Sequence, residues 1–325
     1  GACIGCRAGV RTDVVRAVRR LELVGALVIG ATAATVALSR RQRRGRPLRV
    51  DLGRRRDRPT PPGTHRVSVV VPAFAEADRI DHTVRALRHG LGEWVGDDGL
   101  EIVVVDDGSP DATAAVARLA GADIVVRHET NRGKGAAVRT GVLVANGRTI
   151  VFTDADLSYG PDQIPVLVET VEKGWDVVVG SRRHTDTTTL VRAGRLREIG
   201  GRGINLLTRA VLLGHHRDTQ CGLKGFRSDV ARLIFDHSLV DGFAFDVEVF
   251  HLVERYHLSL AEVPVRISNS SRSSVRVARD AVRLVRDLFL VRRWAMEGRY
   301  DLTADDVLPE LPQAHEVSGP LADLR

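Results

Sequence analysis

The chain has 325 residues, enough for one catalytic domain with extensions, and 43% of them are hydrophobic. Its three cysteines give no disulfide framework and indicate a reducing compartment. The net charge of +7 is unevenly spread: residues 1–66 hold sixteen arginines against four acids, whereas residues 67–270 sum to about −5. This asymmetry indicates that the mildly acidic central part of the chain is held by its basic ends near an anionic surface such as lipid headgroups. Neither basic end interleaves the aromatics that bind nucleic acid, so no nucleic-acid partner is expected.

Residues 1–62 form an arginine-rich region that ends in a proline-rich linker. Within it, residues 21–38 are apolar, with Glu22 as the only charge, and reach the short end of a bilayer span. Three interpretations stay open for this segment: a membrane helix, a signal sequence, and a helix docked on the protein. Ten arginines follow at residues 40–58, so the positive-inside rule predicts that the rest of the chain stays cytoplasmic.

From Val67 onward the pattern repeats strand, turn and helix. Helices are expected to end near His89, Ala120, Ala145 and Lys173, and buried strands are expected at residues 67–71, 101–105, 124–126, 149–152 and 177–179. This alternation predicts one α/β domain over residues 63–270, with a mainly parallel sheet flanked by helices and ligands outside the strand carboxyl ends. The dinucleotide fingerprint and the phosphate-loop pattern are both missing from the sequence, which disfavours dehydrogenases and NTPases.

Asp154 and Asp156 directly follow the strand expected at residues 149–152. Residues two apart in extended chain face the same side. Two carboxylates that face one way at a strand end suit a hard divalent cation, which can also hold phosphate oxygens. The alternative is an aspartate-rich turn that caps the next helix.

The composition changes again after Asn269. Residues 275–294 place arginines at helical spacing opposite an apolar stripe, with the members Arg276, Arg279, Arg283, Arg286, Val282, Val285, Leu288 and Phe289. This pattern predicts a basic amphipathic helix within residues 271–300 that lies flat on an anionic membrane, or alternatively a helix packed on the catalytic domain. The acidic tail at residues 301–325 is predicted to be disordered.

Several short motifs occur in order across residues 66–270. They are Val69-Val70-Val71-Pro72-Ala73-Phe74-Ala75-Glu76, Val104-Val105-Asp106-Asp107-Gly108-Ser109, Asn131-Arg132-Gly133-Lys134-Gly135, Asp154-Ala155-Asp156, Gly180-Ser181-Arg182-Arg183, Asp218-Thr219-Gln220-Cys221-Gly222-Leu223-Lys224-Gly225-Phe226 and Phe245-Asp246-Val247-Glu248. Together they resemble family-2 glycosyltransferases of the GT-A fold, within them the polyprenyl-phosphate and dolichyl-phosphate sugar synthases. The last two motifs look closest to dolichyl-phosphate glucosyltransferases. Ser158 departs from the lipid mannosyl branch, which often has Gln there, and this puts one metal ligand in doubt.

The resemblance implies a nucleotide-sugar site. It places Pro72, Phe74, Glu76 and Asp107 around the nucleoside, with Asp106 supporting the turn; turn and cap chemistry is the alternative for all of them. Lys134 would meet the donor diphosphate and Gln220 the sugar hydroxyls. Asp154 and Asp156 would hold Mg²⁺ or Mn²⁺ across that diphosphate, where the cation neutralises charge on the leaving group.

On the acceptor side, a lipid phosphate is largely ionised at neutral pH, so positioning can carry most of the catalysis. We expect Arg182 and Lys224 to contact this phosphate, because cationic side chains pair well with it. Two interpretations stay open for Asp246 and Glu248. They could assist the acceptor, or they could have a structural role as helix caps or ion-pair partners.

The sequence thus predicts a membrane-associated, metal-dependent inverting glycosyltransferase. It would move a sugar to polyprenyl phosphate on the cytoplasmic face of the cell membrane, with UDP-glucose favoured as donor and GDP-mannose as another possibility. Two alternatives are a glycosyltransferase with a soluble acceptor and a catalytically silent nucleotide-sugar-binding scaffold held at the membrane.

Overall fold

The computed structural model describes residues 59–96, 99–181, 188–189, 221–267, 277–303 and 306, all within the compact unit Arg49–Arg325. The apolar segment at residues 21–38, the predicted site residues Arg182 and Gln220, and nearly all of the acidic tail lie outside these ranges. The described elements are, in chain order, β1 (His65–Ala73), α2 (Ile80–Val95), β2 (Leu100–Asp106), α3 (Thr113–Leu119), β3 (Ile124–Arg127), α4 (Lys134–Val144), β4 (Gly147–Phe152), the short 3₁₀ helix η1 (Pro161–Gln163), α5 (Ile164–Glu172), β5 (Val177–Ser181), β6 (Thr188–Thr189), β7 (Lys224–Arg227), α7 (Ser228–His237), α8 (Phe245–Arg255), β8 (Leu260–Pro264), β9 (Arg266–Ile267) and α9 (Val277–Met296).

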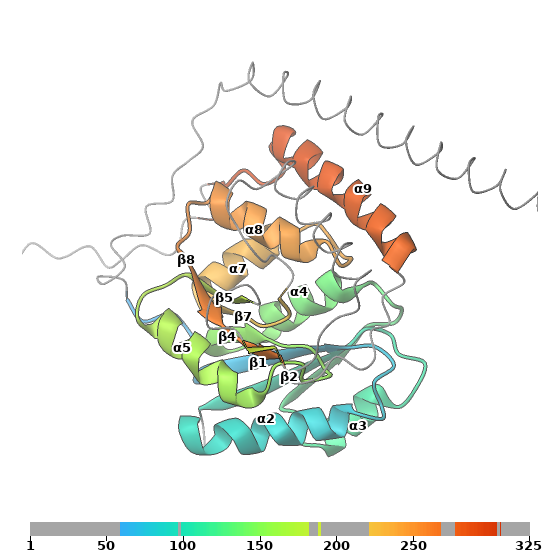
Figure 1. The fold of residues 1–325 in the computed structure, drawn as a ribbon, viewed down its shortest axis with the longest axis vertical. Helices are drawn as coiled ribbons and strands as arrows, with labels where there is room; N and C mark the ends of the chain where they lie inside the picture. The colour runs from blue at the N-terminus through green and yellow to red at the C-terminus, as the bar shows by residue number, and fades with distance from the viewer. Residues whose placement is uncertain are drawn as a thin grey trace, which may run out of the picture. The chain divides into compact units, whose positions relative to one another are not determined.

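Seven of the described strands form one sheet in the order β3-β2-β1-β4-β7-β5-β8 (Figure 1). Strand β7 runs antiparallel to β4 and β5, and every other neighbouring pair in this sheet is parallel. The predicted mainly parallel sheet is therefore confirmed. Strand β7 was not predicted, because four residues with two positive charges carry no strand pattern. The described β6 and β9 pair separately as a small parallel sheet.

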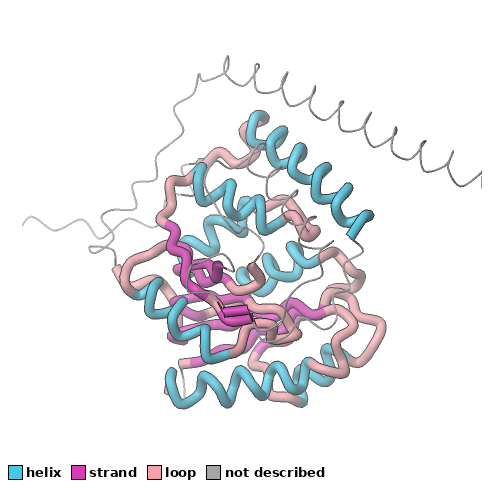
Figure 2. Tube along the Cα trace, in the orientation of Figure 1, coloured by secondary structure: helices cyan, strands magenta, loops and turns pink. Residues whose placement is uncertain are grey.

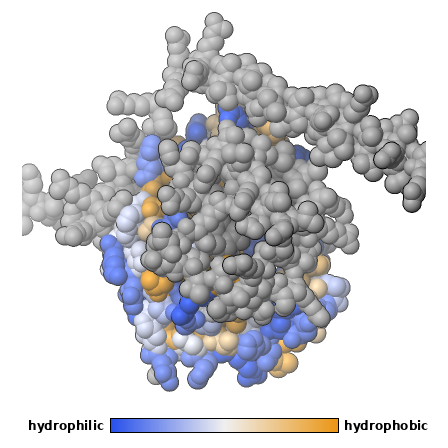
Figure 3. Space-filling view, viewed as in Figure 1, coloured by the Kyte–Doolittle hydropathy of each residue, from blue (hydrophilic) through white to orange (hydrophobic). Residues whose placement is uncertain are grey.

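Helices cover both faces of the sheet, as the tube drawing also shows (Figure 2). One core lies between the sheet and α2, α3 and α5, and the other lies between the sheet and α4, α7, α8 and α9. Successive strand residues alternate between these cores: Val69 and Val71 belong to the first, Val70 and Phe152 to the second. Hydrophilic residues dominate the described surface visible in Figure 3, with scattered apolar residues that are normal for a water-facing surface.

Helix α2 ends later than the sequence pattern predicted. Its buried positions Ile80, Val84, Leu87 and Leu91 continue one apolar stripe past His89, where the prediction placed its end. Because this stripe packs on the sheet, burial carries the helix across Gly90 and Gly92 despite the poor helix propensity of glycine. The helix therefore ends at Val95.

The end of α9 packs on the catalytic domain. Leu288 and Val291 are 1% and 0% exposed and join the core formed with α4, α7 and α8. Leu288, predicted to face lipid, instead faces protein, so the alternative of a packed helix holds for this part of α9. Arg283 and Arg286 are exposed, and contact of residues 271–300 with a membrane surface stays a prediction. None of the described helices has the length and apolar character needed to cross a bilayer.

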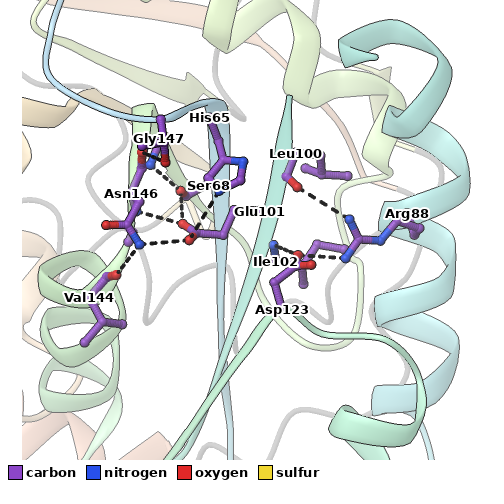
Figure 4. A network of polar contacts seen from close by, with 12 residues as sticks. His65, Ser68, Arg88, Leu100, Glu101, Ile102, Asp123, Val144, Asn146 and Gly147 are labelled. Carbon is purple, nitrogen blue, oxygen red and sulfur yellow. Dashed lines mark hydrogen bonds and ion pairs between the residues drawn. The ribbon is translucent and has the colours of Figure 1, made fainter. Parts of the chain in front are cut away.

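A buried polar network fixes the register of the sheet at the amino ends of its central strands (Figure 4). The Glu101 carboxylate on β2 accepts hydrogen bonds from the Ser68 hydroxyl on β1, from the Asn146 backbone N–H at 2.7 Å and from the Asn146 side-chain amide at 3.0 Å. The Ser68 hydroxyl in turn accepts from the Gly147 N–H at 2.6 Å, at the start of β4. Because buried polar groups must be paired, this network specifies how β1, β2 and β4 align, far from the strand carboxyl ends.

Candidate active site

A lysine and an aspartate from separate motifs meet at the carboxyl edge of the sheet. Lys134 is the first residue of α4, and Asp154 lies two residues beyond the end of β4. The Lys134 Nζ donates to Asp154 Oδ1 at 2.5 Å. Burial opposes the charged form of Lys134, but the carboxylates of Asp154 and Asp246 outweigh it and raise the pKa of the ammonium group. Lys134 is therefore a fixed positive charge beside the two predicted metal ligands.

Asp156 is held by a turn of its own chain. Its Oδ1 accepts the Ser158 N–H at 2.9 Å, and its Oδ2 accepts the Ser158 hydroxyl at 2.8 Å. The residue that departs from the family pattern thus orients the second aspartate. Burial raises the pKa of Glu76, against the opposing effect of Arg79, and the charges of Asp78 and Asp156 raise it further. Negative charge therefore gathers between the loops that follow β1 and β4.

Asp154 and Asp156 fit a divalent cation that also binds a substrate phosphate. Mg²⁺ usually takes one or two protein carboxylates and completes its shell with phosphate oxygens and water. The described residues contain no cluster of three or more His, Cys, Asp or Glu side chains that could hold a metal ion. A carboxylate oxygen has about two lone pairs, so each Asp156 oxygen keeps acceptor capacity beyond its bond to Ser158. Gly222 packs so closely that a Cβ there would collide with Asp154 Oδ2.

Asp107 organises the turn that leads into α4. Its Oδ1 accepts the Arg132 N–H at 3.0 Å and lies 2.7 Å from the His128 ring Nδ1, while its Oδ2 accepts the Gly133 N–H at 2.8 Å. The carboxylate is buried. These contacts are the turn chemistry named as the alternative; a contact between Asp107 and the nucleoside base stays a prediction.

Asp106 and Pro72 lie near the ends of the neighbouring strands β2 and β1. Asp106 Oδ1 accepts the Ser109 N–H at 2.9 Å, and its Oδ2 lies 3.4 Å from Arg127 Nε. These contacts hold the turn after β2, the supporting role expected for Asp106. Pro72 pairs with Val105 in the parallel ladder and is half-buried, so it belongs to the floor of this edge.

The loops after β1 and β2 are tied together by hydrogen bonds between backbone and side chains. The N–H of Ala75 donates to Ser109 Oγ at 2.9 Å, and the N–H of Glu76 donates to Thr113 Oγ1 at 3.0 Å. Ala75 adopts φ 56°, a left-handed conformation that is costly for a residue with a Cβ and often marks functional loops. Phe74 is 46% exposed at this loop, so its ring is presented to solvent at the predicted nucleoside side.

Lys224 lies beneath this edge in a buried ion pair. Its Nζ donates to Asp246 Oδ1 and to the Cys221 carbonyl, both at 2.6 Å, and the residue is 0% exposed. Burial raises the pKa of Asp246, while Lys224 and Lys134 oppose this shift. The buried Lys224 ammonium therefore positions Asp246 in this structure, and its predicted contact with the acceptor phosphate stays a prediction.

The structure decides the open question for Glu248 in favour of a structural role. Glu248 is fully buried in the first turn of α8. Its carboxylate accepts the N–H groups of Leu239 and Val240 at 2.8 and 2.9 Å and the Tyr300 hydroxyl at 2.6 Å. It thereby joins α8, the preceding loop and the segment after α9. Asp246 lies in the same helical turn, and among the charges that act on its pKa, Lys134 lowers it and Asp154 raises it.

The sequence analysis missed His128 at this edge and named Gly222 only within a motif, without a role. His128 directly follows β3, and Gly222 packs against Asp154. The position of His128 at a strand carboxyl end was a usable signal, whereas the proximity of Gly222 to Asp154 depends on long-range folding. Arg182 and Gln220 lie outside the described residues, and their roles stay predictions.

The mainly parallel sheet flanked by helices is of the GT-A-like α/β class, and Lys134, Asp154 and Asp156 lie together at its carboxyl edge. The family model "Glycosyl transferase family 2" matches residues 68–235, and the chain belongs to this family of glycosyltransferases. It is 34% identical to the dolichyl-phosphate beta-glucosyltransferase of Drosophila melanogaster, over 69% of this chain and 74% of that protein. For the Homo sapiens protein of the same name the identity is 30%, over 74% and 78%. The resemblance seen in the motifs is thus confirmed.

The fold also matches a solved structure. Glucosyl-3-phosphoglycerate synthase from Mycobacterium tuberculosis, in complex with Mn²⁺, uridine diphosphate and glucosyl-3-phosphoglycerate, superposes with a TM-score of 0.53 at 23% identity. The match covers 70% of this chain and 80% of that one. At this level of identity the similarity shows the shared fold.

Proposed function

We propose that this glycosyltransferase transfers glucose, with inversion, from UDP-glucose to polyprenyl phosphate on the cytoplasmic face of the cell membrane. The observation that carries the proposal is the contact of Lys134 with Asp154 next to Asp156, which combines a fixed cation and two acids at the ligand-binding edge of the sheet. The similarity to dolichyl-phosphate beta-glucosyltransferases supports the choice of donor and acceptor.

On the donor side, the Lys134 side chain is the group best suited to the diphosphate. The backbone N–H groups of Arg132 and Gly133 already donate to the Asp107 carboxylate. They are therefore engaged within the protein and are not donors to the diphosphate. Lys134 stands at the amino end of an eleven-residue helix, where the helix dipole adds to its positive charge. A diphosphate bound there would share the ammonium group with Asp154.

Asp154 and Asp156 would hold Mg²⁺ or Mn²⁺ against the same diphosphate. When bound, the cation acts as a Lewis acid that stabilises the charge of the leaving nucleoside diphosphate. Ser158 keeps Asp156 in position, and the close packing of Gly222 limits how far Asp154 can turn. The protein's contribution is therefore to fix two carboxylates and one ammonium around a single phosphate-binding point.

On the acceptor side, an ionised lipid phosphate is itself the nucleophile, so no general base is required and orientation carries the rate. We keep Arg182 as the proposed contact to this phosphate. Asp246, held by Lys224, would shape the floor below it. The exposed Arg283 and Arg286 of α9 would favour an anionic membrane surface and would bring the site close to a lipid acceptor.

The test is transfer of labelled sugar by the full chain from UDP-glucose and GDP-mannose to polyprenyl phosphate or to soluble phosphorylated acceptors. We expect glucose in the lipid fraction, with activity lost on chelation and restored by Mg²⁺ or Mn²⁺. Asp156→Asn should abolish transfer, whereas Asp78→Asn, a matched change of an exposed acid whose side chain is 67% accessible, should not.

Two other outcomes of this experiment would support the alternative functions. Transfer to a soluble acceptor and none to lipid would establish the first alternative. Nucleotide binding without any transfer would favour the silent scaffold.

A further inference from the structure

We propose that His128 is a positioning residue for the nucleotide site: it fixes the Asp107 carboxylate and, through it, the turn that presents Lys134. The statement about the turn rests on described contacts alone. The statement about the nucleotide rests on the function proposed above.

His128 bridges the end of a strand and a helix. It follows β3 directly, its backbone N–H donates to the Asp106 carbonyl at 2.9 Å, and the residue is 8% exposed. Its Nδ1 lies 2.7 Å from Asp107 Oδ1, and its Nε2 lies 3.0 Å from the Thr140 hydroxyl on α4. Both ring nitrogens are therefore engaged, one with the turn and the other with the helix that the turn begins.

The chemistry of these partners fixes the direction of the bond to Asp107. An ionised carboxylate only accepts hydrogen bonds, so Nδ1 carries a proton and donates to Asp107. This charge-assisted bond is of the stronger kind and restrains rotation of the carboxylate. The Thr140 hydroxyl can donate or accept, and so satisfies Nε2 with or without a proton there.

The restraint on Asp107 passes directly to the backbone before Lys134. The same carboxylate accepts the N–H groups of Arg132 and Gly133 through its two oxygens. Gly133 adopts φ 111° and packs so tightly that an added Cβ would lie 2.5 Å from the Asp241 carbonyl oxygen. The turn thus has little room to adjust, and a rotated Asp107 would move the first residue of α4 away from Asp154.

Amide side chains can separate the two bonds of the imidazole. In His128→Asn the amide nitrogen takes a place close to Nδ1 and retains the donor to Asp107. In His128→Gln it takes a place closer to Nε2, and the bond to Asp107 is lost. Thr140→Val removes the helix-side bond while keeping the side-chain shape. We expect His128→Gln and His128→Ala to weaken UDP binding and to raise the KM for UDP-glucose about tenfold, equivalent to about 1.4 kcal/mol. The kcat should change less, and His128→Asn should stay close to wild type.

Ser68→Ala supplies the structural control, because it removes two buried hydrogen bonds at the opposite end of the same sheet (Figure 4). Hydrogen exchange of the amides of residues 130–134 gives a readout that needs no ligand. Exchange should accelerate in His128→Gln and His128→Ala, but not in Ser68→Ala or His128→Asn.

Unchanged exchange in His128→Gln, or UDP affinity lost equally in Ser68→Ala, would overturn the proposal. A wild-type chain that binds no UDP would refute the proposed function, while the exchange data would still decide the role of His128.

Discussion

The Lys224→Met variant removes a buried cation and leaves Asp246 without its partner in the protein interior. The side chains have similar length, so the change concerns charge more than packing. Lys224 is 0% exposed and donates to Asp246 Oδ1 at 2.6 Å, which makes this a buried pair. Breaking such a pair by removing one partner costs about 3–5 kcal/mol, a large share of the 5–15 kcal/mol typical of a folded domain. We therefore expect a marked loss of stability.

The loss should depend on pH. Burial already raises the pKa of Asp246, and Lys224 opposes that rise, so removing Lys224 raises the pKa of Asp246 further. A carboxyl group with a raised pKa in the folded state destabilises the fold increasingly as pH rises from its unfolded value through the folded one. The stability deficit of Lys224→Met should therefore be larger at pH 8 than at pH 5.

Urea unfolding followed by the fluorescence of Trp94, Trp175 and Trp294 measures this deficit at both pH values. Replacing both partners by apolar residues, in Lys224→Met with Asp246→Leu, should recover much of the loss, because no charge is then left buried alone. An unchanged unfolding midpoint in Lys224→Met, together with a raised KM for the acceptor, would refute the reasoning. That result would support a contact between Lys224 and the acceptor phosphate.

Three further variants test other parts of the structure. Burial lowers the pKa of His251 to about 4, below its ordinary 6.5. The unfolded state therefore takes up a proton first, and the folded protein loses about 3 kcal/mol of stability as pH falls from 6.5 to 4. His251→Phe keeps an aromatic ring against Tyr300 and should make the stability less dependent on pH between 4 and 6.5. An unaltered pH dependence would argue against this role of His251. Val291→Ala should cost about 2 kcal/mol in urea unfolding, since this α9 side chain is fully buried in the core shared with α4, α7 and α8; no loss would mean that α9 does not pack here. Gly222→Ala should displace the Asp154 carboxylate and reduce metal-dependent transfer at least tenfold with the fold retained, as circular dichroism would show, and full activity would contradict the close packing.

The sheet and its functional edge were predictable because local patterns determine them. Runs such as residues 102–105 are continuously apolar, as expected for strands covered on both faces, and the acids come where those runs end. Asp154 and Lys134 were both assigned to the donor site from separate motifs, and the parallel sheet brings their loops together. In this part of the fold, burial and topology follow the local pattern.

The interior of the site was not predictable in the same way. Nothing within the motif around Lys224 shows that its partner is Asp246, because that pair depends on the antiparallel insertion of β7 beside β4. Likewise, an arginine-rich amphipathic stripe looks the same whether its apolar side meets lipid or protein. The burial of Leu288 follows from contacts with distant helices.

Transfer of labelled glucose from UDP-glucose into an organic-extractable polyprenyl-phosphate product, by the wild-type chain and by Asp156→Asn, tests the central claim most directly. The account predicts a glucosylated lipid phosphate that requires Mg²⁺ or Mn²⁺ and is missing with the variant. Equal product from both proteins, or none from a wild-type chain that binds UDP, would contradict it.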